Sequence, residues 1–153
     1  MKKINYLNLM LVLLTFFSLS SCTSDDSTTK DPRDQYVGTW SSVSTGSLTL
    51  FQNGLSVGTI PLNQNSTVSI SKSGNNILLI DGTSYIVNGN NLNSNPTPIT
   101  QNSNGVNIVA SENSYGTLGS NIIILNNSVT GTWNSTNSTS GNLSGTVVTT
   151  LTR

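Results

Sequence analysis

The chain has 153 residues, the size of one domain, and it carries six acidic and six basic residues. Charged residues make up only 8 % of the chain, histidine is absent, and Asn, Ser and Thr together account for 68 residues. This balance excludes a basic nucleic-acid-binding protein, and it excludes a highly charged disordered tail.

Residues 1–21 have the features of a secretory signal peptide. Lys2 and Lys3 give a positive start, and the apolar stretch that follows is too short to span a membrane comfortably. Small residues then precede Cys22, which is the only cysteine in the sequence and so has no disulfide partner within it. This arrangement resembles a bacterial lipobox, which implies a diacylglycerol on the sulfur of Cys22. A plain secretory signal that ends near a cysteine is the alternative.

Residues 22–35 are predicted to form a lipidated, flexible tether. The segment holds four of the six acidic residues and no large apolar side chain. It therefore buries too little surface to offset the entropy of ordering it. A lipobox cysteine carries two or three acyl chains, which anchor a protein stably to a membrane. We expect an outer-membrane protein that is held by the lipid on Cys22.

Two short motifs in the tether bear on its location and modification. Asp25 and Asp26 resemble the acidic export signal of Bacteroidota lipoproteins, which implies a position on the cell surface. An ordinary solvated linker is the alternative. Asp26 and the two residues after it also match the short O-glycosylation motif of that phylum, which makes Ser27 a candidate glycosylation site.

Residues 36–153 are predicted to form an all-β domain, because apolar and polar residues alternate in short runs separated by turn signals. The pairs Asn53-Gly54 and Asp81-Gly82 are typical of tight hairpin turns. The expected strands are 36–44, 47–52, 55–60, 66–71, 77–81, 84–88, 105–110, 116–118, 121–126, 129–135 and 143–152. Strands joined in this way predict an antiparallel meander that closes into a barrel, or a β-sandwich.

Two runs are apolar on both faces, Ile77–Ile80 and Ile122–Leu125. Such a strand is either covered on both sides or presents an apolar face to a partner.

The opening of the β domain carries a family resemblance. Asp31–Trp40 is similar to the start of small Bacteroidota lipoproteins with a lipocalin-like β domain, and Gly38-x-Trp40 resembles the motif that opens the first strand of lipocalins. The resemblance implies a lipocalin-like barrel whose floor is closed by Trp40. A downstream arginine to cover Trp40 is lacking unless Arg153 serves.

A second Gly-Thr-Trp run ends at Trp133, on one of the last predicted strands. The first and last strands of a closed meander pair with each other, so we expect the two Gly-Thr-Trp runs to approach. Gly38, Trp40 and Trp133 are thus the predicted structural residues.

Few residues in the domain could carry catalytic or metal chemistry. Without histidine there is no usual base for a nucleophilic triad, and Cys22 stands alone as a metal-binding candidate. Asp81 and Glu112 are the only carboxylate side chains after residue 35, and paired carboxylates cleave glycosides. Both lie in polar turns or loops. We expect no catalytic residues, no metal, no cofactor and no nucleic-acid partner.

Two functions remain. The first is a lipid-anchored cell-envelope protein whose non-catalytic domain acts in protein interaction or structure. The alternative is a lipocalin-like carrier or receptor for a small apolar or glycan ligand, with its binding residues unknown. A filled interior favours the first function, and an apolar cavity with an opening favours the second.

The lipobox gives the first testable prediction. Cys22→Ala removes the only acylation site, so the variant should leave the membrane fraction and accumulate as a soluble or mislocalised precursor. Membrane fractionation with detergent phase partition measures this, and Ser21→Ala is the matched control. Recovery of the Cys22→Ala protein with the outer membranes would contradict the lipoprotein interpretation.

Overall fold

The computed structural model describes residues 30–103, 105–137 and 139–153. The predicted signal peptide at residues 1–21, the lipidation site Cys22 and the glycosylation candidate Ser27 lie outside these described residues. One compact unit spans Pro32–Arg153, and it carries the features that follow.

The unit is all-β, as the alternating pattern predicted. Its described elements are η2 (Pro32–Tyr36, a short 3-10 helix), β1 (Gly38–Gln52), β2 (Leu55–Ser73), β3 (Ile77–Ile80), β4 (Thr83–Asn88), β5 (Asn91–Ser94), β6 (Thr97–Ser103), β7 (Val106–Leu118), β8 (Ile122–Ser135) and β9 (Ser140–Thr152). Each paired strand runs antiparallel to its neighbour, which confirms the predicted meander.

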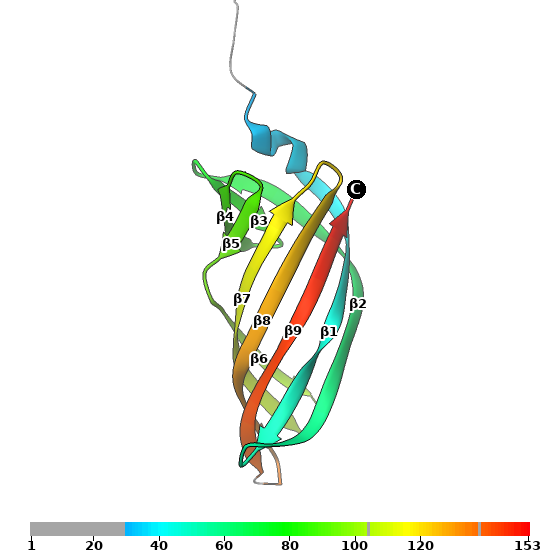
Figure 1. Cartoon of the computed structure of the whole chain (residues 1–153), viewed down its shortest axis with the longest axis vertical. Helices are drawn as coiled ribbons and strands as arrows, with labels where there is room; N and C mark the ends of the chain where they lie inside the picture. Colours follow the sequence, from blue (N-terminus) through cyan, green and yellow to red (C-terminus); the bar gives the residue numbers. More distant parts are fainter. Residues whose placement is uncertain (1–29, 104, 138) are drawn as a thin grey trace, which may run out of the picture. The chain divides into compact units, whose positions relative to one another are not determined.

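The sheet rings round on itself. Its strand order is β5-β4-β3-β2-β1-β9-β8-β7-β6, so the first and last strands are neighbours, as predicted. A further pairing of Asn91–Asn93 in β5 with β7 joins the two sides of the sheet. Every strand except β6 thereby belongs to a closed ring at the end of the sheet that carries the C terminus (Figure 1). We call this end the upper end, and the end with the Asn53-Gly54 turn the lower end.

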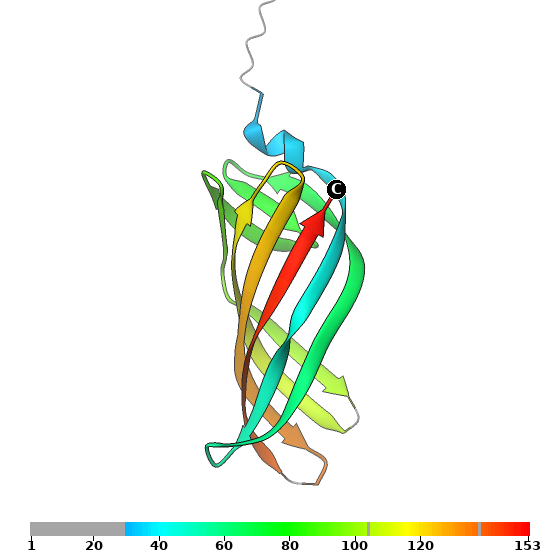
Figure 2. The ribbon, with the colours of Figure 1, turned by 45° about the vertical axis from the view of Figure 1, so that its right-hand side comes forward.

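The wall of the sheet is open at the lower end, between β2 and β6. Among the described strands, β6 pairs only with β7, and β2 pairs with β3 only through Ile70–Ser73. Figures 1 and 2 show β3, β4 and β5 near the upper end, with β6 extending toward the lower end. Pro61 and Pro98 lie in the two strands that border the opening. Proline is tolerated on strand edges and discourages a further strand from pairing there.

The strands are longer than predicted. The expected strands 36–44 and 47–52 merge into β1, which begins at Gly38, and the same merging produces β2, β7 and β8. The expected strands do not include β5 or β6. Pro96 and Pro98 lie where β5 ends and β6 begins, and proline is not typical of strand interiors. The merged strands continue through runs that contain threonine, which is among the residues enriched in strands.

The interior holds two apolar cores. The upper core consists of Tyr36, Trp40, Ile70, Leu78, Ile80, Tyr85, Leu92, Leu118, Ile123, Leu125 and Leu151. The lower core consists of Leu48, Ile108, Ala110, Val129, Trp133 and Leu143. Trp40 and Trp133 thus lie in different cores, and the expectation that the two Gly-Thr-Trp runs approach is wrong. The reason is direction: Trp40 begins β1 at the upper end, whereas Trp133 is near the end of β8 at the lower end.

Trp40 is held from two sides at the upper end. Its side chain is 1 % exposed, and its Nε1 donates a hydrogen bond to the Tyr36 carbonyl at 2.8 Å. The Arg153 guanidinium lies over the indole at 5.7 Å from the ring centroid, and it donates to the carbonyls of Gln35 and Val37 at 2.7 and 3.0 Å. Arg153 therefore covers Trp40, a cation–π contact between the two ends of the domain.

Gly38 makes room for this arrangement. Its φ of +132° is one that residues with a Cβ rarely adopt, and a Cβ there would come within 3.0 Å of Arg153 Nη2.

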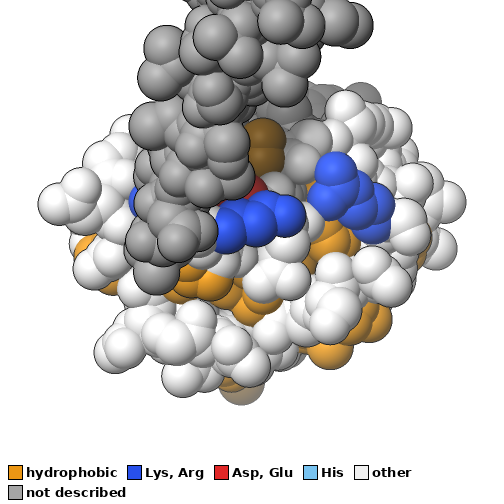
Figure 3. Space-filling view, turned by 90° about the horizontal axis from the view of Figure 1, so that it is seen from above, with side chains coloured by type: hydrophobic (Ala, Val, Ile, Leu, Met, Phe, Trp, Pro, Cys, Tyr) orange, Lys and Arg blue, Asp and Glu red, His pale blue; other side chains and the backbone are white. Residues whose placement is uncertain are grey.

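The folded unit begins earlier than the sequence indicated. Arg33 Nη1 donates to the carbonyls of Gly74 and Ile77 at 3.0 and 3.1 Å, and Asp34 forms an ion pair with Lys72. Residues 32–35 are thus fastened to the sheet, and the predicted extension of the flexible tether to Gln35 is wrong. The prediction failed because this contact uses charged side chains and backbone carbonyls, whereas the sequence argument considered apolar burial alone. Figure 3 shows basic side chains beside hydrophobic ones at the upper end.

The upper core yields a stability prediction. Trp40→Ala should lower the free energy of unfolding by about 3–5 kcal/mol, the usual range for a core tryptophan. Small domains hold only about 5–15 kcal/mol in total, so the variant should be close to unfolding at growth temperature. Urea denaturation followed by circular dichroism measures the loss. Trp40→Phe keeps an aromatic ring but loses the hydrogen bond to the Tyr36 carbonyl, so its free energy of unfolding should fall by less than that of Trp40→Ala. An unchanged unfolding midpoint in Trp40→Ala would contradict the role of Trp40 as a core anchor.

Candidate ligand pocket

A cavity of about 470 Å³ lies inside the lower half of the sheet. Cavities of roughly 300–1,000 Å³ are typical of small-molecule sites. The described residues that line it are Ser44, Leu48, Pro61, Leu62, Asn63, Gln64, Ile99, Gln101, Ile108, Ala110, Glu112, Asn127, Val129, Val147 and Thr149. They include residues of β2 and β6, the strands that border the break in the wall. We infer that the break gives the cavity its opening to solvent.

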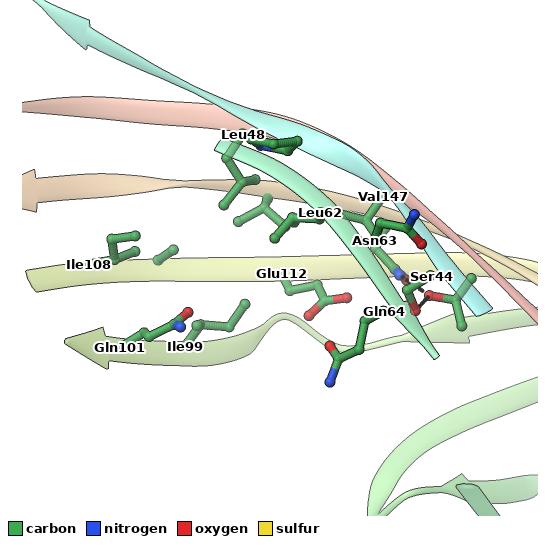
Figure 4. A pocket seen from close by; sticks show the side chains of 15 residues that line it. Ser44, Leu48, Leu62, Asn63, Gln64, Ile99, Gln101, Ile108, Glu112 and Val147 are labelled. Atoms are coloured by element: carbon green, nitrogen blue, oxygen red, sulfur yellow. Dashed lines mark hydrogen bonds between the residues drawn. The ribbon is translucent and has the colours of Figure 1, made fainter. Parts of the chain in front are cut away.

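The cavity has an apolar end and a polar end. Strand alternation points Leu48, Ile108 and Val129 inward, and these residues belong to the lower core. Toward the upper end the inward residues become polar. Figure 4 shows Glu112 with Leu62, Ile99 and Ile108 on one side of it, and Ser44 and Gln64 on the other. The cavity therefore suits a ligand with an apolar body and a polar group.

Hydrogen bonds between strands organise the polar end. Ser44 Oγ on β1 and Thr149 Oγ1 on β9 lie 2.8 Å apart, and Asn127 Nδ2 on β8 donates to the same Thr149 oxygen at 3.1 Å. Asn127 is only 7 % exposed, and its Oδ1 is buried without a partner among the described residues. Most buried polar atoms are hydrogen-bonded, so this unpaired acceptor marks a place where a ligand donor would fit.

Glu112 on β7 is the charged member of the lining. Ser114 Oγ donates a long hydrogen bond of 3.4 Å to its Oε1. Burial raises the pKa of the Glu112 carboxyl above its ordinary value of 4.5, and the bond from Ser114 partly opposes this shift. Burial likewise raises the pKa of Tyr85. A side-chain hydrogen bond with Ser114 opposes this shift, and the charge of Glu112 adds to it. The carboxylate is thus partly desolvated and weakly satisfied by its neighbours.

The two carboxylates singled out from the sequence are not brought together. Asp81 lies in the β3–β4 turn with a φ of 48°, and its backbone N–H donates to the Ser69 carbonyl at 2.9 Å. It is not among the described residues that line the cavity, whereas Glu112 is. Within residues 30–103, 105–137 and 139–153, no three His, Cys, Asp or Glu side chains gather in a way that could hold a metal ion.

Sequence reasoning missed most of the polar end. Asn127 fell between the predicted strands 121–126 and 129–135, and Ser44 and Thr149 were not singled out. A signal was present in the strand alternation: Asn127 lies between Leu125 and Val129 on the inward face of β8. A polar residue that interrupts a row of inward apolar residues marks a polar layer.

Comparisons with known proteins do not indicate a function for this chain. No family model, curated protein or solved structure matches the chain. None of the helices in the described part of the chain has the length and apolar character needed to cross a membrane.

Glu112 gives a pH-dependent prediction. Because its pKa is raised in the folded state, the folded domain holds this proton more tightly than the unfolded chain does. Its contribution to stability is therefore fully present below the unfolded pKa near 4.5, and it is lost as the pH rises through the folded pKa. Glu112→Gln cannot ionise, so its melting temperature relative to wild type should rise between pH 4 and pH 7. Thermal melts across this range measure the difference, and a constant difference would contradict the raised pKa.

Proposed function

We propose that the protein is a lipid-anchored cell-envelope binding protein whose β domain holds a small amphipathic ligand in the lateral cavity. The observation that carries the proposal is the cavity itself, which combines an apolar end with the buried, unpaired Oδ1 of Asn127. A domain that served only as a scaffold would gain stability from filling this space. The hollow interior is the feature that favours the carrier or receptor function over the purely structural one.

The location is proposed from the N-terminal sequence. The lipobox-like residues before Cys22 support a lipid anchor, and Asp25 and Asp26 support export to the cell surface. Such a protein would hold its ligand close to the outer membrane. We propose no catalytic step, because the cavity pairs Glu112 with hydroxyl and amide groups rather than with a second acid or a base.

Protein interaction is the second candidate, and an exposed apolar patch supports it. Ile122 and Ile124 on β8 are 42 % and 36 % exposed, and Val148 on β9 and Val43 on β1 are 40 % and 43 % exposed. The register places Ile124 and Val43 on either side of Thr150, so these side chains share one outer face. A partner on this face would leave the cavity untouched, so blocking the cavity separates the two functions.

The binding proposal predicts that a solvatochromic dye enters the cavity. Nile red should show a blue-shifted, enhanced emission with the wild-type domain, because the lower half of the cavity is apolar. Leu62→Trp places a larger side chain in the cavity and should weaken dye binding about tenfold or more. Fluorescence titration measures both.

The matched control is Val57→Trp, which adds the same side chain at an exposed position of the same strand. It should bind the dye like wild type. The absence of dye binding by the wild-type domain, or an equal loss in both variants, would overturn the proposed function.

A further inference from the structure

The described residues at the polar end of the cavity include a carboxylate and no basic side chain. Glu112 is the only charged residue among the described residues that line it. The basic side chains with defined contacts act at the upper end: Arg33 reaches the β2–β3 turn, Lys72 pairs with Asp34, and Arg153 covers Trp40. A partly desolvated carboxylate without a counter-ion is unfavourable. A cationic group that enters the cavity would be attracted to this negative charge and would donate hydrogen bonds to it.

Two acceptors lie close enough to act on one group. Glu112 on β7 is opposite Val129 on β8, and Asn127 is two residues from Val129 on the same inward face. Such diagonal neighbours in an antiparallel pair lie roughly 7–8 Å apart at the backbone, within reach of one group between their side chains. Asn127 Oδ1 has no donor among the described residues, and the Glu112 carboxylate accepts a long hydrogen bond from Ser114 Oγ, so both oxygens can take a further donor.

The other polar side chains that line the cavity do not change its preference for a ligand that donates hydrogen bonds. Asn63, Gln64 and Gln101 lie on β2 and β6, the strands that border the opening, and all three are exposed. Their amides remain hydrated and can adapt to a donor or an acceptor. Asn127 Oδ1, by contrast, is a buried acceptor, and together with the half-buried Glu112 carboxylate it decides which polar group fits.

We propose that the ligand is a small amphipathic amine, whose ammonium group donates to the Glu112 carboxylate and to Asn127 Oδ1 while its apolar body packs on Leu48, Leu62 and Ile108. This inference rests on the proposed binding function and names its ligand class. An ammonium supplies several donors and a positive charge, whereas an alcohol supplies one donor and no charge. A carboxylate would place like charges together. The cavity volume of about 470 Å³ fits one small molecule.

The experiment is competitive displacement of Nile red at pH 7 by octylamine, octanol and octanoate, which share a chain length and differ in the polar group. Octylamine should displace the dye at a concentration at least tenfold lower than octanol, and octanoate should be the weakest. Glu112→Gln keeps the size of the side chain but removes its charge, and it should reduce the preference for the amine over the alcohol to about threefold or less.

Asp81→Asn is the matched control, because it removes a carboxylate that lies outside the cavity, and it should keep the full preference for the amine. Equal displacement by octylamine and octanol in the wild-type domain would overturn the inference while leaving the binding function intact. A preference for octylamine in Glu112→Gln that is as large as in the wild-type domain would also overturn it. Failure of Nile red to bind the wild-type domain would instead overturn the proposed function itself.

Discussion

The pairing of β1 with β9 is the contact on which the rest of the structure depends. It joins Ser41–Phe51 to Asn142–Thr152, segments about a hundred residues apart, along eleven register positions. This pairing turns the meander back on itself and brings Arg153 over Trp40. It also sets Thr149 of β9 opposite Ser44 of β1, which begins the polar layer of the cavity. One long-range pairing thus positions the upper core and the candidate site.

Incomplete closure explains why one half of the interior is packed and the other is hollow. At the upper end the short strands β3, β4 and β5 bridge from β2 to β7, and the side chains inside this ring form a filled core. At the lower end only β6 continues from β7, and it does not reach β2 among the described strands. The lower interior therefore stays open beside the lower core. The filled upper core and the cavity thus lie at different ends of the same sheet.

The alternation of residues predicted the local features well. It indicated the all-β class, the meander and the neighbouring first and last strands. The Asn53-Gly54 and Asp81-Gly82 turns have the positive φ values that such pairs favour. The alternation failed to predict the features that depend on contacts between residues far apart in the sequence. Whether β2 meets β6 depends on how far β3, β4 and β5 extend, and Pro61 and Pro98 mark strand edges without fixing that length. The cavity follows from this non-local property.

The lengths of the strands show the same limit. The predicted strands 36–44 and 47–52 left a break at Thr45 and Gly46, and small polar residues and glycine are typical of turns. In the structure Ser44 points inward and its Oγ is hydrogen-bonded with Thr149 Oγ1, and β1 continues without interruption. Whether this part of β1 forms a loop or a strand therefore depends on a partner more than a hundred residues away in the sequence. The docked Pro32–Tyr36 helix was missed for a related reason, since its attachment uses Arg33 and carbonyls of the distant β2–β3 turn.

The composition of the inward face also bears on function. Along β8 the inward residues are Ile123, Leu125, Asn127, Val129 and Gly131, so one amide interrupts an otherwise apolar row. An apolar side chain at that position would leave no buried acceptor unpaired and would match its neighbours above and below. Glu112 similarly follows Ala110 on the inward face of β7 and is partly desolvated. Sites that break the local rules of packing are where binding is expected, because the missing partner can be supplied by a ligand. The two exceptions lie on adjacent strands and line the same cavity, and this coincidence favours a binding site over two unrelated defects of packing.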